Sequence, residues 1–428
     1  MNWKNFGSTK FLVPNLYFKS QYRNVAWFSN VPLADPDPIF GMTDSFLQDS
    51  SKDKVNLGVG SYRNDDGNPH VLQSVRKAEL KIMCKSMDKE YSGMIGNQEF
   101  GRKAFDFAMG EGNEFSECGR TVYCDTVAGS GAICVVGGFL SKWFPEKKVI
   151  YLSEPTWPNQ HRILEYAGMT TKTYRYYNEK TLGLDFEGMK DDLNKLPCKS
   201  IVLFHASAHN PTGVDPTPKQ WDELVCICKE KQFYVFFDFA YQGFGTGDYD
   251  LDAYPVRQFA KAGLGMAICQ SFSKNMGLYG ERAGLASFIC ESPEEAKRVE
   301  SQVKLIARSI YSNPPINGAR IVLEILSDKT LKELWLKELK QMSARILWAR
   351  KTLKEGLAKA GSTKNWDHIT NQIGMFSYTG IKPAGVKRLI KDYHIYMMDN
   401  GRISVSGINT KNVDYVCNAF HKVVSETK

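Results

Sequence analysis

The 428-residue sequence lacks several features that would place it in a specialised class of protein. No apolar run approaches the roughly 18 residues that a membrane-spanning helix needs, so we expect no membrane span. The absence of low-complexity tracts and of a repeat period excludes fibrous and solenoid architectures. The ten cysteines include no CxxC pair, and neither they nor the seven histidines are spaced as zinc ligands or as a disulfide framework. An ordinary globular protein in a reducing compartment is therefore expected.

Acidic residues are missing from the first 34 positions, which hold four cations and thus half of the net charge of +8. Acid-free, basic and amphipathic N-terminal segments are typical of mitochondrial transit peptides, and we predict one at residues 1–26. The mitochondrial matrix is the expected compartment, with the cytoplasm as the alternative; a disordered or docking arm is the other interpretation of this segment. The rest of the chain is only modestly basic and has no basic cluster with interleaved aromatics. We therefore expect anionic small-molecule ligands and no nucleic acid.

Two domains are expected at this length, because one hydrophobic core rarely grows so large. Short β-rich runs alternate with amphipathic helices in the middle of the chain, which predicts an α/β fold with a mostly parallel sheet covered by helices. A long helix near 330–360 and shorter strands after it predict a second, smaller α+β domain, onto which residues 31–54 fold back. The predicted sheet strands are 149–153, 200–205, 233–239, 266–271 and 285–290. The predicted domains are an N-terminal arm and part of the small domain at 27–68, a large domain at 69–340 and a small domain at 341–428.

One lysine, Lys274, follows an apolar strand in the string QSFSKNMGLYGERAG at 270–284. A lysine buried there must find a partner or lose its charge, and a neutral amine is what Schiff-base chemistry requires. The neighbouring Ser271, Ser273 and Arg282 suit a dianionic phosphate. Taken alone, Lys274 has the simpler interpretation of a solvated loop lysine.

Three further strings follow β-rich runs. FFDFAYQGFG ends an apolar run with Asp238, where a buried carboxylate needs a cation such as a protonated pyridine nitrogen, unless it only caps a helix. Tyr241 and, in HASAHNPTG, Asn210 are candidates to bond the phenolic oxygen of such a cofactor, with His205 supporting Asn210. VAGSGA at 127–132 begins an apolar helix whose free backbone N–H groups suit a phosphate, although close packing also explains such glycines.

Two arginines lie beside apolar runs, Arg308 in ARSIYSNPP and Arg402 in DNGRISVSG. Guanidiniums that face one cleft together would recognise a dicarboxylate, one carboxylate each. Separately, each would be a structural ion-pair residue.

Taken together, the strings SFSKNMGLYGERAG, DFAYQGF, AHNPTG, PTWPN, YSNPP and GRIS, in this order and spacing, resemble class I aspartate aminotransferases, closest to the mitochondrial type. The resemblance extends from about Trp27 to the C-terminus. It implies the type I fold of pyridoxal-phosphate-dependent transferases, with a seven-stranded sheet in the large domain. It also implies reversible transfer of the amino group between L-aspartate and 2-oxoglutarate, giving oxaloacetate and L-glutamate, by a homodimer with shared active sites.

The resemblance further implies a role for each site residue. Lys274 would form a Schiff base with pyridoxal 5′-phosphate and shuttle the proton, and Asp238 would pair with the pyridinium. Tyr241 and Asn210 would bond the phenolic oxygen, and Trp157 would stack on the ring. The substrate would meet Gly60 and Arg402, with Arg308 of the partner subunit on its distal carboxylate. The phosphate would be held by Gly129, Ser130, Ser271, Ser273 and Arg282, with Tyr91 of the partner subunit.

The sequence departs from the family pattern at two positions near the expected cofactor. Ala128 removes a hydroxyl that usually faces the phosphate. Gln160 stands where the family has a histidine that supports the pyridinium-binding aspartate, and His161 is displaced by one place. An active enzyme with altered cofactor affinity or substrate range is therefore predicted.

Three alternatives remain to the aspartate enzyme. They are an aminotransferase of shifted specificity for aromatic amino acids or kynurenine, a pyridoxal-phosphate-dependent lyase or decarboxylase, and a non-catalytic protein derived from the enzyme. Retention of Arg308 and Arg402 favours dicarboxylate substrates. Retention of Lys274, Asp238 and Arg282 with them favours a catalyst.

Overall fold

The computed structural model describes residues 27–34 and 38–426, so the predicted transit peptide at 1–26 lies outside the described residues. Residues 27–34 form a turn in which the Val31 N–H donates to the Phe28 carbonyl oxygen (3.1 Å), and Trp27, Phe28 and Leu33 are exposed. The chain from Pro38 onward forms a separate compact unit. No helix within the described ranges is long and apolar enough to cross a membrane.

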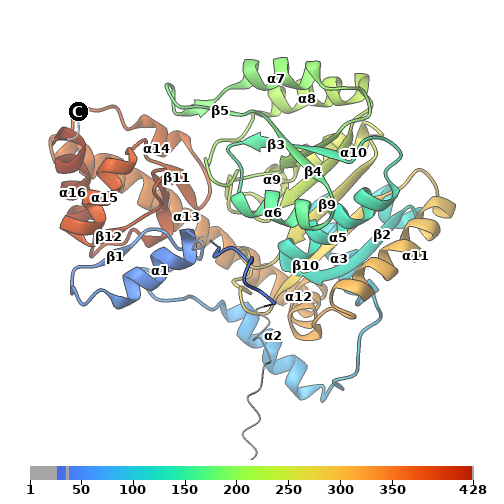
Figure 1. The fold of residues 1–428 in the computed structure, drawn as a ribbon. Helices are drawn as coiled ribbons and strands as arrows, with labels where there is room; N and C mark the ends of the chain where they lie inside the picture. Colours follow the sequence, from blue (N-terminus) through green and yellow to red (C-terminus); the bar gives the residue numbers. More distant parts are fainter. Residues whose placement is uncertain (1–26, 35–37, 427–428) are drawn as a thin grey trace, which may run out of the picture. The chain divides into compact units, whose positions relative to one another are not determined.

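A seven-stranded sheet is the centre of this unit (Figure 1). The strand order is β2-β10-β9-β8-β7-β3-β4, and every strand except β10 runs in the same direction. The predicted α/β class and mostly parallel sheet are confirmed, and the five predicted strands agree with the structure to within two residues. The strands are β2 Thr121–Val127, β3 Val149–Glu154, β4 Thr170–Arg175, β7 Ile201–His205, β8 Tyr234–Phe239, β9 Met266–Ser271 and β10 Ala283–Ile289.

Helices cover both faces of the sheet, which explains why its central strands are continuously apolar. Successive residues point to opposite faces, so Leu203 and Phe236 join one core and Val202 and Phe237 the other. The first core contains residues of α5 Ala128–Trp143, α6 Pro158–Tyr166 and α11 Pro293–Ile310. The second contains residues of α2 Gln73–Cys84, α3 Gln98–Met109, α8 Pro218–Glu230, α10 Tyr254–Lys261 and α12 Ile316–Ser327.

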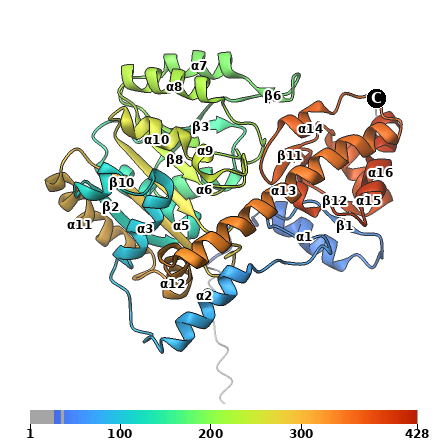
Figure 2. The same ribbon diagram turned by 180° about the vertical axis from the view of Figure 1, so that it is seen from behind.

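The C-terminal part is reached along the 31-residue helix α13, Lys329–Lys359 (Figure 2). Its short strands pair as β11 Phe376–Tyr378 with β13 Arg402–Ser404, and β1 Val55–Asn56 with β12 Ile395–Tyr396. Helix α1, Pro38–Gln48, contacts β12, so the predicted return of the N-terminal segment onto this part is confirmed for the residues from Pro38 onward. The helix predicted at 330–360 is also confirmed. Because α13 runs unbroken through residue 340, the domain boundary there stays a prediction.

The remaining elements are short or peripheral. They are α4 Glu114–Glu117, β5 Tyr177–Asn178, β6 Gly183–Leu184, α7 Phe186–Lys195, α9 Tyr249–Asp252, α14 Asp367–Asn371, α15 Pro383–Tyr393, the 3-10 turn Val405–Gly407 and α16 Val413–Glu426.

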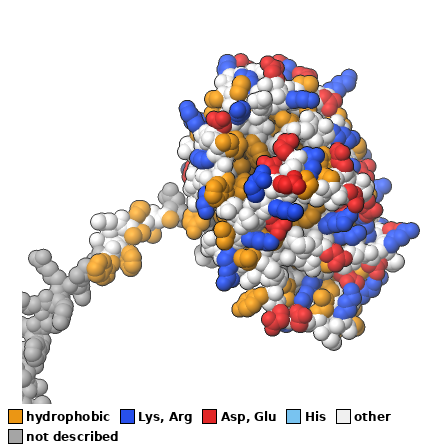
Figure 3. Space-filling view, turned by 90° about the vertical axis from the view of Figure 1, so that its right-hand side faces the viewer, with side chains coloured by type: hydrophobic (Ala, Val, Ile, Leu, Met, Phe, Trp, Pro, Cys, Tyr) orange, Lys and Arg blue, Asp and Glu red, His pale blue; other side chains and the backbone are white. Residues whose placement is uncertain are grey.

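The surface carries charges of both signs. On the face shown in Figure 3, Lys and Arg side chains are interspersed with Asp and Glu.

Candidate active site

The strings singled out in the sequence meet at one edge of the sheet. The carboxyl ends of parallel strands share an edge, and Asp238 in β8 and Ser271 in β9 lie there. Strand β10 runs the opposite way, so it begins at this edge, where Gly284 pairs with Ser271 and Ala283 with Val127. The antiparallel strand thereby brings Arg282 beside residues that the sequence places far from it.

Lys274 lies just beyond β9 with its amine held inside the protein. Its Nζ donates to the carbonyl oxygen of Gly60 (2.6 Å) and lies 4.9 Å from the centre of the Tyr279 ring. Burial, with smaller contributions from the positive charges of Arg402 and Arg282, lowers the pKa of Lys274 to about 8. The interpretation as a solvated loop lysine is therefore wrong, and a neutral amine is accessible near physiological pH.

Asp238 is buried and accepts a hydrogen bond at the end of a chain of polar groups. The backbone N–H of Asn210 donates to His205 Nδ1 (3.2 Å), and burial lowers the pKa of His205 to about 3. The neutral ring therefore carries its proton on Nε2, which donates to Gln160 Oε1 (3.2 Å). Gln160 Nε2 in turn donates to Asp238 Oδ2 (2.6 Å). Burial nevertheless raises the pKa of Asp238 to about 6, so this carboxyl favours a cationic neighbour.

Gln160 thus makes the bond to Asp238 directly, and the displaced His161 instead contacts Thr171 Oγ1 (2.9 Å). The Gln160 amide is fully buried and also accepts a hydrogen bond from the Thr156 hydroxyl, which fixes its orientation.

We expect Gln160→Leu to lower cofactor affinity about 10- to 150-fold, because a buried hydrogen bond to a charged group contributes about 1.5–3 kcal/mol. Equilibrium dialysis of the cofactor measures this change, with His161→Gln as the control that faces away from Asp238. Equal affinity in Gln160→Leu and the parent protein would show that Asp238 needs no such support.

Arg402 lies across the cleft with a buried guanidinium. Its Nη2 donates to the Gly58 carbonyl oxygen (3.0 Å), its Nη1 lies 3.5 Å from Asn210 Oδ1, and its charge lies 4.4 Å from the centre of the Phe376 ring. Its Nε has no hydrogen-bond partner, and no Asp or Glu among residues 27–34 and 38–426 forms an ion pair with it. A buried cation without a counter-charge is a site for an anion.

Tyr241 is buried, and the charges of both Asp238 and Arg402 act on its hydroxyl. Burial, with the nearby Asp238 charge, raises the pKa of its hydroxyl, which therefore stays protonated and can donate a hydrogen bond. The Asn210 amide interacts with the same hydroxyl. Trp157 is half-buried immediately before α6, one turn ahead of Gln160.

A cradle of donors surrounds the start of α5. Gly129 and Ser130 belong to the first turn of this 16-residue helix, and a side chain on Gly129 would lie 3.3 Å from Ser271 Cβ. Within the described part of the chain, the Ser273 hydroxyl is buried without a hydrogen-bond partner, and the hydrogen bond found for Arg282 is its donation to the Tyr279 carbonyl oxygen (2.9 Å). Free hydroxyl, guanidinium and backbone N–H donors at a helix start fit a phosphate dianion.

Tyr91 and Arg308 lie away from this chain's own cleft, as expected of residues predicted to serve the cleft of a partner subunit. Tyr91 is 87% exposed, and Arg308 is exposed at the end of α11, where it donates to the Ser312 hydroxyl. Their loops are neighbours, because Asn313 Nδ2 donates to the Ser92 carbonyl oxygen (2.6 Å). The surface hollow here is lined by Tyr91, Asp125 and Arg320 and does not include Lys274. Their assignment to a partner subunit's cleft stays a prediction.

Sequence reasoning missed three groups that shape the cleft: the Gly58 carbonyl, Tyr279 and Phe376. The Tyr279 hydroxyl accepts a hydrogen bond from the Tyr62 backbone N–H (2.7 Å), and the centre of its ring lies 4.9 Å from Lys274 Nζ. It lies within the GLYGER string, which could have drawn attention to it. A backbone carbonyl such as that of Gly58 leaves no signal in a sequence.

The fold and the site together define an enzyme that holds a phosphate-bearing cofactor beside a buried lysine amine and an acidic partner. The chain matches the model of the class I and II aminotransferases over residues 52–420, and it belongs to this family. Enzymes of this family depend on pyridoxal phosphate, and they are generally homodimers that act on amino and oxo acids.

Three related proteins illustrate the similarity. A mitochondrial aspartate aminotransferase of Xenopus tropicalis is 48% identical over 403 residues, which are 94% of this chain and 94% of the relative. The solved structure of a cytoplasmic aspartate aminotransferase of Saccharomyces cerevisiae is 40% identical with a TM-score of 0.91, covering 94% of this chain and 99% of that one. An aromatic-amino-acid aminotransferase of Burkholderia pseudomallei, covalently bound to pyridoxal phosphate, is 39% identical with a TM-score of 0.90, covering 93% and 99%.

Proposed function

We propose that this chain is an aspartate aminotransferase, which transfers the amino group between L-aspartate and 2-oxoglutarate and yields oxaloacetate and L-glutamate. The observation that carries the proposal is the buried Arg402 guanidinium, which no carboxylate of the described residues neutralises, in the same cleft as the Lys274 amine. The nearly full-length relatives named for this activity support it.

The residues present fit pyridoxal 5′-phosphate. Gly129, Ser130, Ser271, Ser273 and Arg282 would hold its phosphate, since they present free donors around the start of α5. Tyr241 and Asn210 would donate to its phenolic oxygen, Trp157 would stack on its ring, and Asp238 would face its ring nitrogen. Bound there, the cofactor supplies an electron-withdrawing ring that stabilises negative charge on the substrate's α-carbon.

The chain itself supplies orientation and proton transfer. Lys274 would attach the cofactor and, once displaced by the substrate amine, would take the proton from the substrate's α-carbon with its neutral Nζ and deliver it to the former aldehyde carbon of the cofactor. Its low pKa suits both steps, because the amine can accept and release a proton near neutral pH. Arg402 would hold the α-carboxylate and Gly60 would approach the substrate through its backbone, so the α-hydrogen faces Lys274.

The distal carboxylate would be bound by Arg308 of a second copy of the chain, and Tyr91 would reach that copy's phosphate. The support is that both side chains are exposed and their loops are joined by a hydrogen bond, which presents them on one surface. The enzyme would thus be a homodimer with shared active sites. Relatives that are named mitochondrial aspartate aminotransferases support the mitochondrial matrix as its compartment, and a cytoplasmic yeast relative keeps the cytoplasm as the alternative.

The test is the absorption spectrum of the purified protein with cofactor, followed on addition of L-aspartate and then of 2-oxoglutarate. We expect the spectrum to convert with aspartate and to return with 2-oxoglutarate, with oxaloacetate and glutamate formed in equal amounts. A higher kcat/KM for phenylalanine than for aspartate would favour the aromatic specificity instead. Release of ammonia or carbon dioxide would overturn the aminotransferase reaction.

A further inference from the structure

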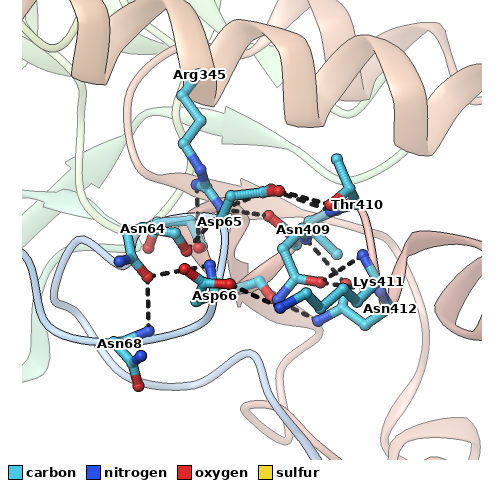
Figure 4. A network of polar contacts seen from close by, with 12 residues as sticks. Asn64, Asp65, Asp66, Asn68, Arg345, Asn409, Thr410, Lys411 and Asn412 are labelled. Carbon is cyan, nitrogen blue, oxygen red and sulfur yellow. Dashed lines mark hydrogen bonds and ion pairs between the residues drawn. The ribbon is translucent and has the colours of Figure 1, made fainter.

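Arg345 of α13 joins two segments that are far apart in the sequence, one around Asn64 and one before Asn409 (Figure 4). Its guanidinium donates to the carbonyl oxygens of Asn64 (3.2 Å), Ser406 (3.3 Å) and Ile408 (2.9 Å). The side chain is 14% exposed, and its charge lies 5.6 Å from the centre of the Tyr62 ring. One planar cation therefore holds three backbone groups in fixed directions.

Each of these segments also carries groups of the candidate active site. In the first, the Gly58 carbonyl oxygen accepts from Arg402 Nη2 (3.0 Å) and the Gly60 carbonyl oxygen accepts from Lys274 Nζ (2.6 Å). The second begins with Arg402 itself in β13. Between these groups and Arg345, the Ser406 hydroxyl donates to the Ser61 carbonyl oxygen (3.0 Å), which ties the segments together once more.

Ion pairs and hydrogen bonds at the surface reinforce the same junction. Thr410 N donates to Asp65 Oδ1 (3.1 Å), and Lys411 Nζ pairs with Asp66 Oδ1 (2.6 Å) (Figure 4). Both members of the Lys411–Asp66 pair are more than 60% exposed, so water and salt weaken it. Arg345 is therefore the member of the junction whose bonds are protected from solvent.

We propose that Arg345 is a positioning residue for substrate binding, which fixes the direction of Arg402 and of the Gly58–Gly60 backbone toward the substrate's α-carboxylate. This inference rests on the proposed function. Among the described residues, Arg345 makes no hydrogen bond to Lys274 or to the phosphate cradle. Its bonds hold the segments that carry Arg402 and the Gly58–Gly60 backbone, so we expect its larger effect on the carboxylate site. A misplacement of about 1 Å in a positioning group costs up to about 100-fold in the rate of a bound reaction.

The experiment compares the parent holoenzyme with Arg345→Met, using spectral titration with succinate, a dicarboxylate that has no amino group to transfer. We expect the succinate dissociation constant and the KM for aspartate to rise at least tenfold, with the cofactor dissociation constant changed less than twofold. Arg257→Met is the matched control: Arg257 is 22% exposed, donates to the Ala108 carbonyl oxygen (2.9 Å) and pairs with Asp250, away from both segments. It should leave succinate binding unchanged.

Arg345→Lys keeps the charge but loses the planar fork, and we expect an intermediate rise in the succinate dissociation constant; it serves as the test if Arg345→Met does not fold. A lower melting temperature with unchanged succinate affinity in either variant would overturn the proposal, because it would show a purely structural role. An equal loss of cofactor affinity would also overturn it. If the parent enzyme neither binds succinate nor transaminates aspartate, the proposed function itself fails, whatever the variants do.

Discussion

Replacing Lys274 by alanine is expected to lower kcat for aspartate by at least about 10⁴-fold, since it removes both the amine that attaches the cofactor and the base that moves the proton. The buried Nζ is held by the Gly60 carbonyl oxygen (2.6 Å). Borohydride reduction followed by peptide mass analysis measures the attachment. The reduced cofactor should be found on the peptide that contains Lys274 in the parent protein and should be missing in the variant.

Lys261→Ala is the control, because Lys261 is exposed at the end of α10. A Lys274→Ala protein that keeps a tenth of the parent activity, or a cofactor adduct on another lysine, would contradict the assignment. The pKa of about 8 adds a second expectation for the same amine. The neutral, nucleophilic form dominates above pH 8 and falls about tenfold for each pH unit below it, so cofactor attachment to the cofactor-free protein should slow in that proportion between pH 7 and pH 6.

Replacing Asp238 by asparagine is expected to lower kcat roughly 10²- to 10⁴-fold, because breaking a buried ion pair costs about 3–5 kcal/mol. Asparagine keeps the shape and still accepts from Gln160 Nε2, so the change isolates the charge. Steady-state kinetics under cofactor excess, together with the cofactor dissociation constant, measure the effect. An unchanged kcat would show that Asp238 does not face the ring nitrogen.

Asp238→Asn is expected to lower kcat but to raise the stability of the cofactor-free protein. The folded-state pKa of Asp238, about 6, lies above its ordinary value, so the native state binds more protons than the unfolded chain between about pH 4 and pH 6 and loses stability as pH rises through this range. Without its cation, ionised Asp238 therefore destabilises the fold at pH 7.5, and Asp238→Asn should be more stable by about 3 kcal/mol in urea unfolding. Asp222→Asn, at an exposed position of α8, is the control. A less stable Asp238→Asn protein would show that the carboxylate serves folding.

The strands that form the centre of the sheet were predictable because they are short apolar runs bounded by turns and helices. β2 and β4 were not among the predicted strands. β4, with the sequence TTKTYR, is an edge strand that is mostly exposed and has no apolar run to reveal it. The reversed direction of β10 was also hidden, although it decides where Arg282 lies. Strand direction follows from how the connections pack, and no local pattern encodes it.

The sequence by itself determined the α/β class and which residues are chemically suited to a cofactor, because motif spacing and apolar runs are local properties of the chain. The tertiary structure alone decided the state of these residues. Burial changes the pKa values of Lys274 and Asp238, and folding brings the Gly58 carbonyl to Arg402 and the Gln160 amide to Asp238 across more than 70 positions. Desolvation and hydrogen bonding depend on neighbours in space, and those neighbours are set by the whole fold.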